Sequence, residues 1–130
     1  MSGEGSGKDR IAPGSEDDRI GTFTEFRQRM NERILAEPNQ VVRRFFALDT
    51  QAYAAGALDA KTKELCGLVA SMVLRCDDCI SYHVAQCRDA GVTRDEMFEA
   101  FSVGLVVGGS IVIPHLRRAV DFLDELGKEQ

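Results

Sequence analysis

The spacing of apolar residues is the feature that most constrains this fold, because from Thr22 onward they recur every three or four positions. The first segment with this helical period has apolar side chains at Phe23, Phe26, Met30 and Ile34. Thr22 or Thr24 supplies the side-chain oxygen that can cap its start. No stretch has the strict alternation of a strand. We therefore predict an all-α fold of about six helices with short connections.

Punctuating residues divide the middle of the chain into three further helices. Pro38 stands where a second helix can begin. Gly56 precedes a third predicted helix at about 60–74, and a fourth ends near Ala90. Gly91 follows it and can take a left-handed conformation at low cost, which is typical of the residue after a helix end.

Two helices are predicted in the last third. Thr93 and Glu96 match a capping box, so the fifth helix starts there and runs toward Gly108. Pro114 lies near the start of the last helix, or at a kink in it. Apolar residues cover nearly every side of the fifth helix, at Phe101, Val103, Leu105, Val106 and Val107. A helix of this kind is buried in a core or at a subunit interface, and we expect the interface to contribute.

Length and composition predict one globular domain after a tail. The chain has 130 residues, of which 44% are apolar and 28% charged. Residues 1–20 are rich in glycine, serine and charge and poor in large apolar groups, so we predict a flexible tail. Residues 21–130 are predicted to form a single helical domain.

Charge and hydropathy argue against several functional classes. The net charge is −5 and the pI about 5.0, which disfavours a nucleic-acid binder. The longest apolar stretch, 103–113, is short and interrupted by glycines, so no membrane span is expected. The N-terminus lacks the apolar region of a secretory signal, and we expect a cytoplasmic protein. Four cysteines in that compartment do not indicate a disulfide framework.

The stretch Cys76-Asp77-Asp78-Cys79-Ile80-Ser81-Tyr82-His83 indicates redox chemistry. On a helix Cys76, Cys79 and His83 share one face, and the two cysteines are near enough to form a disulfide. A thiolate at a helix start is stabilised by the free amide groups there and can attack a peroxide or a disulfide. His83 can carry a proton near neutral pH. The second sulfur can close a sulfenic acid to a disulfide before overoxidation.

Three carboxylates near these residues affect the predicted reactivity of the thiols and of His83. Asp77 and Asp78 suit the first turn of a helix, but they also raise the pKa of neighbouring thiols. If the chain reverses at residues 75–77, Glu64 on the preceding helix can face the dithiol and orient His83. Taken alone, Glu64 is more often a solvated surface charge.

The spacing of these residues resembles a known signature. Glu64, eleven residues, Cys76-x-x-Cys79, three residues and His83 match the pattern of the alkylhydroperoxidase D-like branch of the carboxymuconolactone decarboxylase family. The segments 58–64 and 90–96 are also similar to that family. The likeness extends over about residues 57–126.

The resemblance implies an all-α homo-oligomer, commonly a trimer or hexamer, that reduces hydroperoxides with an external thiol reductant and without a cofactor. It implies that Cys79 is the peroxidatic nucleophile, that Cys76 is the resolving partner, and that Glu64 and His83 form the proton relay. The family's peroxidases have a second histidine just before the second cysteine, where this chain has Asp78. The departure weakens the expectation of peroxide turnover relative to redox sensing or disulfide exchange.

A metal-binding structural oligomer is a further alternative. Cys87 lies four residues beyond His83 on the same face, but ligands on one continuous helix cannot easily surround a zinc ion, so no metal site is expected. Cys66 and Cys87 are expected to be small buried hydrophobic residues. His115 is expected to be an ordinary, partly exposed histidine.

The remaining polar groups of interest are assigned structural roles. Arg117 and Arg118 are expected to form surface ion pairs. Tyr82 is expected to pack or to lie at an interface.

Overall fold

The fold is all-α over residues 20–128, the part of the chain that the computed structural model describes. The all-α prediction is confirmed there, and that range contains no strand. Of the predicted tail, all but residue 20 lies outside the described residues. The elements are a helix at 20–35, α2 (Gln40–Tyr53), α3 (Ala60–Leu74), α4 (Asp77–Asp89), α5 (Arg94–Gly108), a 3₁₀ turn η1 (Ser110–Val112) and α6 (Ile113–Lys128).

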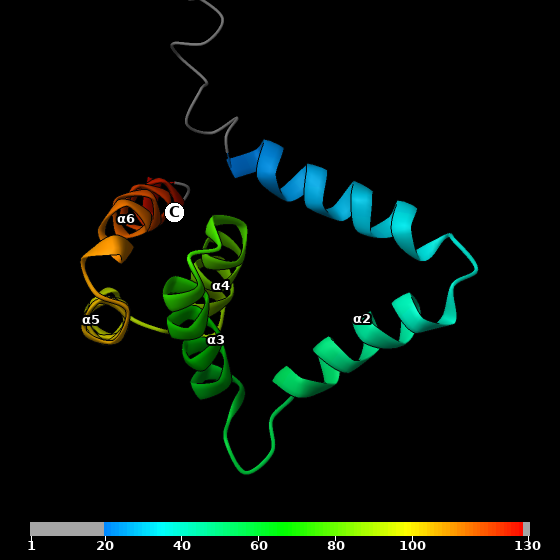
Figure 1. Ribbon diagram of the computed structural model, residues 1–130, viewed down its shortest axis with the longest axis horizontal. Helices are drawn as coiled ribbons and strands as arrows, with labels where there is room; N and C mark the ends of the chain where they lie inside the picture. Colours follow the sequence, from blue (N-terminus) through cyan, green and yellow to red (C-terminus); the bar gives the residue numbers. More distant parts are fainter. Residues whose placement is uncertain (1–19, 129–130) are drawn as a thin grey trace, which may run out of the picture.

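A bundle of α3, α4, α5 and α6 contains most of the core. α3 packs against α4 and α5, α4 packs against α6, and η1 joins α5 to α6 (Figure 1). The largest fully buried side chains are Leu68, Met72, Ile80, Val84, Cys87, Met97, Phe101 and Val112. These side chains come from α3, α4, α5 and η1, and their burial supplies the main driving force for the bundle. Within residues 20–128 no helix has both the length and the hydrophobicity needed to span a membrane.

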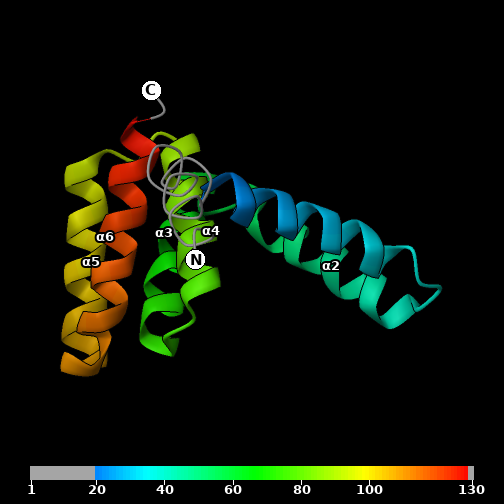
Figure 2. The same ribbon diagram turned by 90° about the horizontal axis from the view of Figure 1, so that it is seen from above.

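The helix at 20–35 and α2 form an arm that projects from the bundle. The two helices meet at a turn far from the bundle and diverge toward it (Figures 1 and 2). At the base of the arm, Phe23 packs edge to face against Phe122 of α6, with ring centroids 5.8 Å apart. α2 has no buried residue, although its sequence is strongly amphipathic.

Local cap chemistry explains most of the helix boundaries. The predicted boundaries of α3 are confirmed at residues 60–74, with Asp59 as the N-cap that accepts the amide hydrogen of Thr62. Gly91 has φ +91°, and Pro114 is the second residue of α6, both as predicted. The prediction that Thr22 or Thr24 caps the first helix is wrong. The chain is already helical at residue 20, so both threonines lie within the helix.

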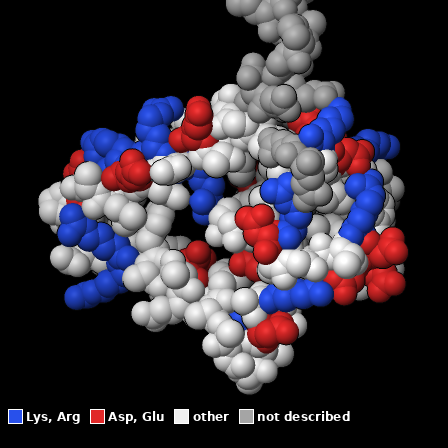
Figure 3. Space-filling view, turned by 180° about the vertical axis from the view of Figure 1, so that it is seen from behind, with Lys and Arg blue, Asp and Glu red and all other residues white. Residues whose placement is uncertain are grey.

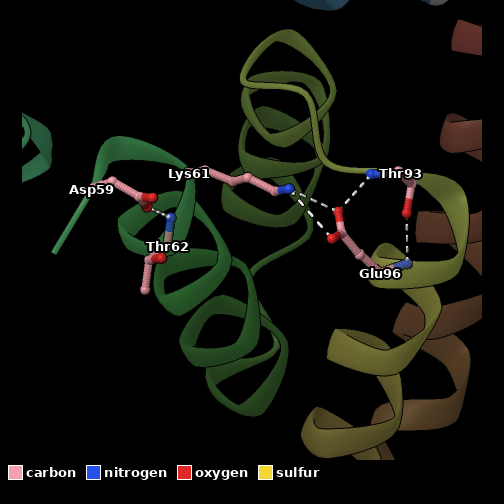
Figure 4. Close-up of polar contacts among 5 residues, drawn as sticks. All are labelled: Asp59, Lys61, Thr62, Thr93 and Glu96. Carbon is pink, nitrogen blue, oxygen red and sulfur yellow. Dashed lines mark hydrogen bonds and ion pairs between the residues drawn. The ribbon is translucent and has the colours of Figure 1, made fainter.

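The predicted capping box at α5 is confirmed, and it also connects two helices. The Thr93 hydroxyl accepts the Glu96 amide hydrogen at 3.1 Å, and the Glu96 carboxylate accepts that of Thr93 at 2.9 Å. Lys61 of α3 lies 3.0 Å from the same carboxylate (Figure 4). The Thr93 amide, followed by Lys61, lowers the pKa of Glu96. The link between α3 and α5 is therefore present at neutral pH and is lost as pH falls through that lowered pKa.

We expect Thr93→Ala to destabilise the protein by about 1 kcal/mol, because it removes the side-chain acceptor at the start of α5. Urea unfolding followed by circular dichroism measures the change. Thr24→Ala is the matched control. It removes a hydroxyl from within a helix, where alanine is the better helix former, and should leave the midpoint unchanged or slightly higher. Equal losses in both variants would contradict the capping assignment.

Candidate functional site

The turn between α3 and α4 creates the site. Arg75 ends α3 in the left-handed conformation, with φ 61°, which is uncommon for a residue with a side chain. Its amide bonds back to Met72, and the next amide, that of Cys76, donates to the Ser71 carbonyl at 3.1 Å. α4 begins directly afterwards at Asp77 and packs along α3. The expected reversal at residues 75–77 is therefore confirmed.

The two cysteines of the dithiol occupy the first turn of α4. Cys76 is the N-cap, and its sulfur accepts the Cys79 backbone N–H at 3.4 Å. Both are free thiols, with Cys76 half-buried and Cys79 exposed. A cysteine sulfur that takes the place of a capping oxygen receives the partial positive charge of the helix N-terminus. The arrangement keeps both sulfurs within one turn of helix and open to a reactant.

Glu64 and His83 meet between α3 and α4. Glu64 Oε1 lies 2.9 Å from His83 Nδ1, and each residue retains less than a tenth of its possible exposed surface. The alternative of a solvated Glu64 is wrong, because its position on the inner face of α3 directs it at α4. A buried carboxylate must have a partner, and the imidazole provides one. The pair is a polar contact within the otherwise apolar interface between α3 and α4.

Tyr53 completes this group and was not predicted from the sequence. Its hydroxyl lies 3.3 Å from His83 Nε2, and the two rings are tilted with centroids 5.3 Å apart. Tyr53 is the last residue of α2, in a segment for which the sequence indicated only an apolar helix. No fixed spacing relates it to the dithiol. Only the path of the arm brings it to His83.

A cavity of about 340 Å³ lies between the arm and α4. Figure 3 shows the hollow that separates the two parts of the molecule. Cys79 and His83 line it from α4, together with Asp78 and Tyr82. The arm contributes the remaining lining residues, namely Phe23, Phe26, Arg27, Met30, Asn31 and Asp49. A small organic molecule held there would touch the Cys79 thiol and the imidazole together.

The surroundings hold Cys79 in its thiol form. The hydrogen bond with Cys76 is the largest cause, followed by burial and by the negative charge nearby, including Asp78; together they raise the pKa of Cys79 to about 11. The predicted effect of the acidic dipeptide on a neighbouring thiol is therefore present at Cys79 for Asp78 alone. Thiolate formation at neutral pH needs a proton acceptor close by.

The other acidic residue of the dithiol motif faces α6. Asp77 Oδ1 lies 2.7 Å from His115 Nδ1, and Asp77 Oδ2 lies 3.3 Å from Arg118 Nη1. His115 is partly exposed, as expected, and Arg118 forms an ion pair, as expected. The contacts fasten the first turn of α4 to α6. They leave Asp78, rather than Asp77, beside the cavity.

The remaining cysteines differ from each other. Cys87 is fully buried as expected, and burial, followed by Glu64, raises its pKa to about 12. The expectation for Cys66 is wrong, because it is exposed. The buried face of α3 is formed by residues 64, 67, 68, 71 and 72, and position 66 falls on the opposite side. Within the described part of the chain, no group of three or more His, Cys, Asp or Glu residues is arranged to hold a metal ion.

Comparison with known proteins gives one family. The profile of the carboxymuconolactone decarboxylase family matches residues 39–122. A protein of Paracoccus denitrificans, described as uncharacterized protein 4 in the cox locus, is 34% identical over 82 residues, which cover 63% of this chain and 74% of that protein. An uncharacterized protein of Cupriavidus necator is 28% identical over 71 residues, 55% of this chain and 63% of that protein.

Solved structures share the fold. A Thermotoga maritima protein is 56% identical and superposes with a TM-score of 0.81, over 83% of this chain and 95% of that one. A second structure from that organism, with a TM-score of 0.79, is described as a carboxymuconolactone decarboxylase family protein with a suggested involvement in an antioxidative response. A family member from Legionella pneumophila is 28% identical with a TM-score of 0.57, over 86% and 90% of the two chains.

We expect the alkylation rate of Cys79 to rise about tenfold per unit between about pH 7 and pH 10, because only the thiolate reacts and its fraction grows up to the raised pKa. Iodoacetamide labelling with peptide mass spectrometry measures this rate. Cys76→Ala removes the largest cause of the raised pKa and should move the rise to lower pH. The buried Cys87 in the same digest is the internal control. A Cys79 rate that does not change over this range would contradict the assignment.

Proposed function

The chain belongs to the carboxymuconolactone decarboxylase family, and we propose that it is a thiol-dependent peroxidase that reduces hydroperoxides with Cys76 and Cys79. One observation carries the proposal. The buried contact of 2.9 Å with Glu64 orients the His83 imidazole, and His83 lines the same cavity as Cys79. An imidazole oriented by a carboxylate is the usual device for moving a proton to or from a neighbouring group.

The proposed oxidation begins at Cys79. Its thiol proton goes to the imidazole, and the thiolate attacks the terminal oxygen of the hydroperoxide. The O–O bond breaks, Cys79 becomes a sulfenic acid, and the alkoxide takes the proton back from His83 to leave as the alcohol. Glu64 stabilises the imidazolium that exists between these two proton transfers.

The proposed cycle closes with two thiol steps. The Cys76 thiol attacks the sulfenic sulfur, so that a disulfide forms and water leaves. An external dithiol then reduces this disulfide by exchange, and its own sulfurs become oxidised. Because every electron comes from thiols, the cycle needs no cofactor. The antioxidative role suggested for the Thermotoga maritima relative agrees with this chemistry.

Disulfide exchange without peroxide turnover is the second candidate function. It is favoured by Asp78, which stands where the resemblance to the family's peroxidases calls for a histidine. A histidine there could donate a proton to the departing alkoxide, a step that disulfide exchange does not include. In this alternative the dithiol senses redox state or exchanges with a protein disulfide.

We expect the wild-type protein to consume an organic hydroperoxide in the presence of a dithiol reductant, and Cys79→Ser to abolish that consumption. Cys76→Ser cannot form the intramolecular disulfide, so its turnover should fall and should depend on direct reduction of the Cys79 sulfenic acid by the external dithiol. Glu64→Gln should lower the rate about a hundredfold. Cys66→Ser is the matched control, because this cysteine is exposed on the other face of α3.

A peroxide assay coupled to reductant oxidation gives these rates. Equal rates in all four variants would reject the peroxidase. A disulfide that forms with oxidised glutathione, in a protein with no peroxide turnover, would favour the exchange function.

The proposal includes a homo-oligomer, a trimer or hexamer as the family resemblance implies. Large apolar side chains are exposed along the arm, including Val41 at 74%, Phe45 at 66% and Leu48 at 60%. They recur at helical spacing on α2 and form one apolar face. A second group, Val103, Val106 and Val107, is exposed on α5. Contiguous apolar faces of this kind mark association surfaces.

We expect Phe45→Glu to lower the molar mass in solution, because a charge on the apolar face of α2 cannot be buried against another copy without a partner. Size-exclusion chromatography with light scattering measures the mass. Gln51→Glu adds the same charge to the same helix outside the set Val41, Phe45 and Leu48, and it should leave the mass at the wild-type value. A wild-type protein that is monomeric at micromolar concentration would contradict the oligomer.

A further inference from the structure

We propose that Tyr53 is a positioning residue for His83, delivered to the site by the arm; this inference deepens the peroxidase function proposed above and rests on it. The Tyr53 hydroxyl lies 3.3 Å from His83 Nε2, while Glu64 lies 2.9 Å from His83 Nδ1. Each ring nitrogen therefore has its own partner. Glu64 comes from α3, His83 from α4 and Tyr53 from α2, so that three helices converge on one imidazole.

The chemistry of the two partners assigns the protons. A carboxylate only accepts hydrogen bonds, so Nδ1 carries hydrogen and donates it to Glu64. In the neutral imidazole, Nε2 then holds a lone pair and accepts the Tyr53 O–H. When His83 is protonated, Nε2 donates instead and the hydroxyl oxygen accepts. A hydroxyl serves both states of the ring, whereas a carboxylate or an ammonium group would suit only one of them.

The length of the contact suits this use. At 3.3 Å the bond between Tyr53 and Nε2 is longer than the 2.9 Å bond between Glu64 and Nδ1. Glu64 is the stronger partner, because its bond is charge-assisted, and it fixes the ring. Tyr53 is the weaker partner, so its hydrogen bond to Nε2 can break when Nε2 exchanges a proton with the Cys79 thiol.

Gly67 shows that space is kept for this contact. A Cβ at this position of α3 would lie 2.6 Å from the Tyr53 hydroxyl, 2.7 Å from His83 Cε1 and 2.9 Å from His83 Nε2. Gly67 lies in a helix interior, where glycine costs stability relative to alanine. The absence of a side chain at this position is what allows the tyrosine and the imidazole to meet over α3.

The environment keeps Tyr53 as a hydroxyl. Burial raises the pKa of Tyr53, and the negative charges of Glu64 and Asp49 raise it further. The group is therefore a neutral donor and acceptor at neutral pH, and not a phenolate that would hold a proton on His83.

The placement makes the arm part of the site. Tyr53 is the last residue of α2, a helix with no buried residue of its own. Its contact with His83 is thus a direct link between the arm and the proton relay. A displacement of the arm would release Nε2 while leaving Glu64 in contact with Nδ1.

The test compares Tyr53→Phe, which removes only the hydroxyl, with Thr50→Val as control. Thr50 lies on the same helix, and its hydroxyl bonds to the Phe46 carbonyl, away from His83. Nitrogen-15 NMR of the imidazole should show His83 Nε2 as a hydrogen-bonded acceptor in the wild type and in Thr50→Val. In Tyr53→Phe its resonance should move to the position of a free lone pair. The turnover number should fall roughly tenfold, with little change in KM for the hydroperoxide.

Gly67→Ala gives an independent route to the same state, because its Cβ displaces the hydroxyl and the ring. Its effect and that of Tyr53→Phe should be less than additive in the double variant. An Nε2 resonance that is identical in wild type and Tyr53→Phe would overturn the inference, whatever the rates. If the wild-type protein consumes no peroxide, the peroxidase proposal fails by itself. The NMR comparison then still decides the role of Tyr53.

Discussion

The hydrogen bond between Glu64 and His83 is the interaction on which the rest of the site depends. Both groups are buried, and either one alone would be an unpaired polar group inside a helix contact. Their pairing fixes the register of α4 against α3. It also sets the imidazole one turn from the exposed thiol of Cys79. The packing of the bundle and the geometry of the dithiol are thus parts of one arrangement, since the same pair of helices supplies both.

Two electrostatic effects act in opposite directions at the dithiol, one favouring the thiolate and the other the thiol. The first turn of α4 offers free amide groups, and the Cys76 sulfur accepts one of them. The Cys76 hydrogen bond, followed by burial and by the negative charge nearby that includes Asp78, favours the protonated form of Cys79. Asp77 is held by His115 and Arg118 of α6, so its charge is partly compensated. A resting thiol that ionises only with the help of a base fits a site in which an oriented imidazole stands beside it.

The arm, which includes α2 within the range matched by the family profile, also reaches the site. Its helices expose apolar side chains that a monomer leaves without partners. Its inner surface forms most of the cavity over Cys79, and its last residue, Tyr53, touches His83. In the proposed oligomer, association through the exposed apolar side chains of α2 would therefore also hold the residues of the arm that line the cavity. The proposed oligomer and the proposed site would be coupled, because the same two helices contribute to each.

The sequence by itself determined the helices and the dithiol. Helical period, the Thr93 and Glu96 box, Gly91 and the spacing of Cys76, Cys79 and His83 are local patterns, and their physics acts over one or two turns. Tertiary structure decided the rest. Burial of Glu64 and exposure of Cys66 both depend on which face of α3 packs against α4. Tyr53 reaches His83 only because of the path of the arm. Contacts between distant segments have no period in the sequence, because they are set by the packing of whole helices and not by neighbours along the chain.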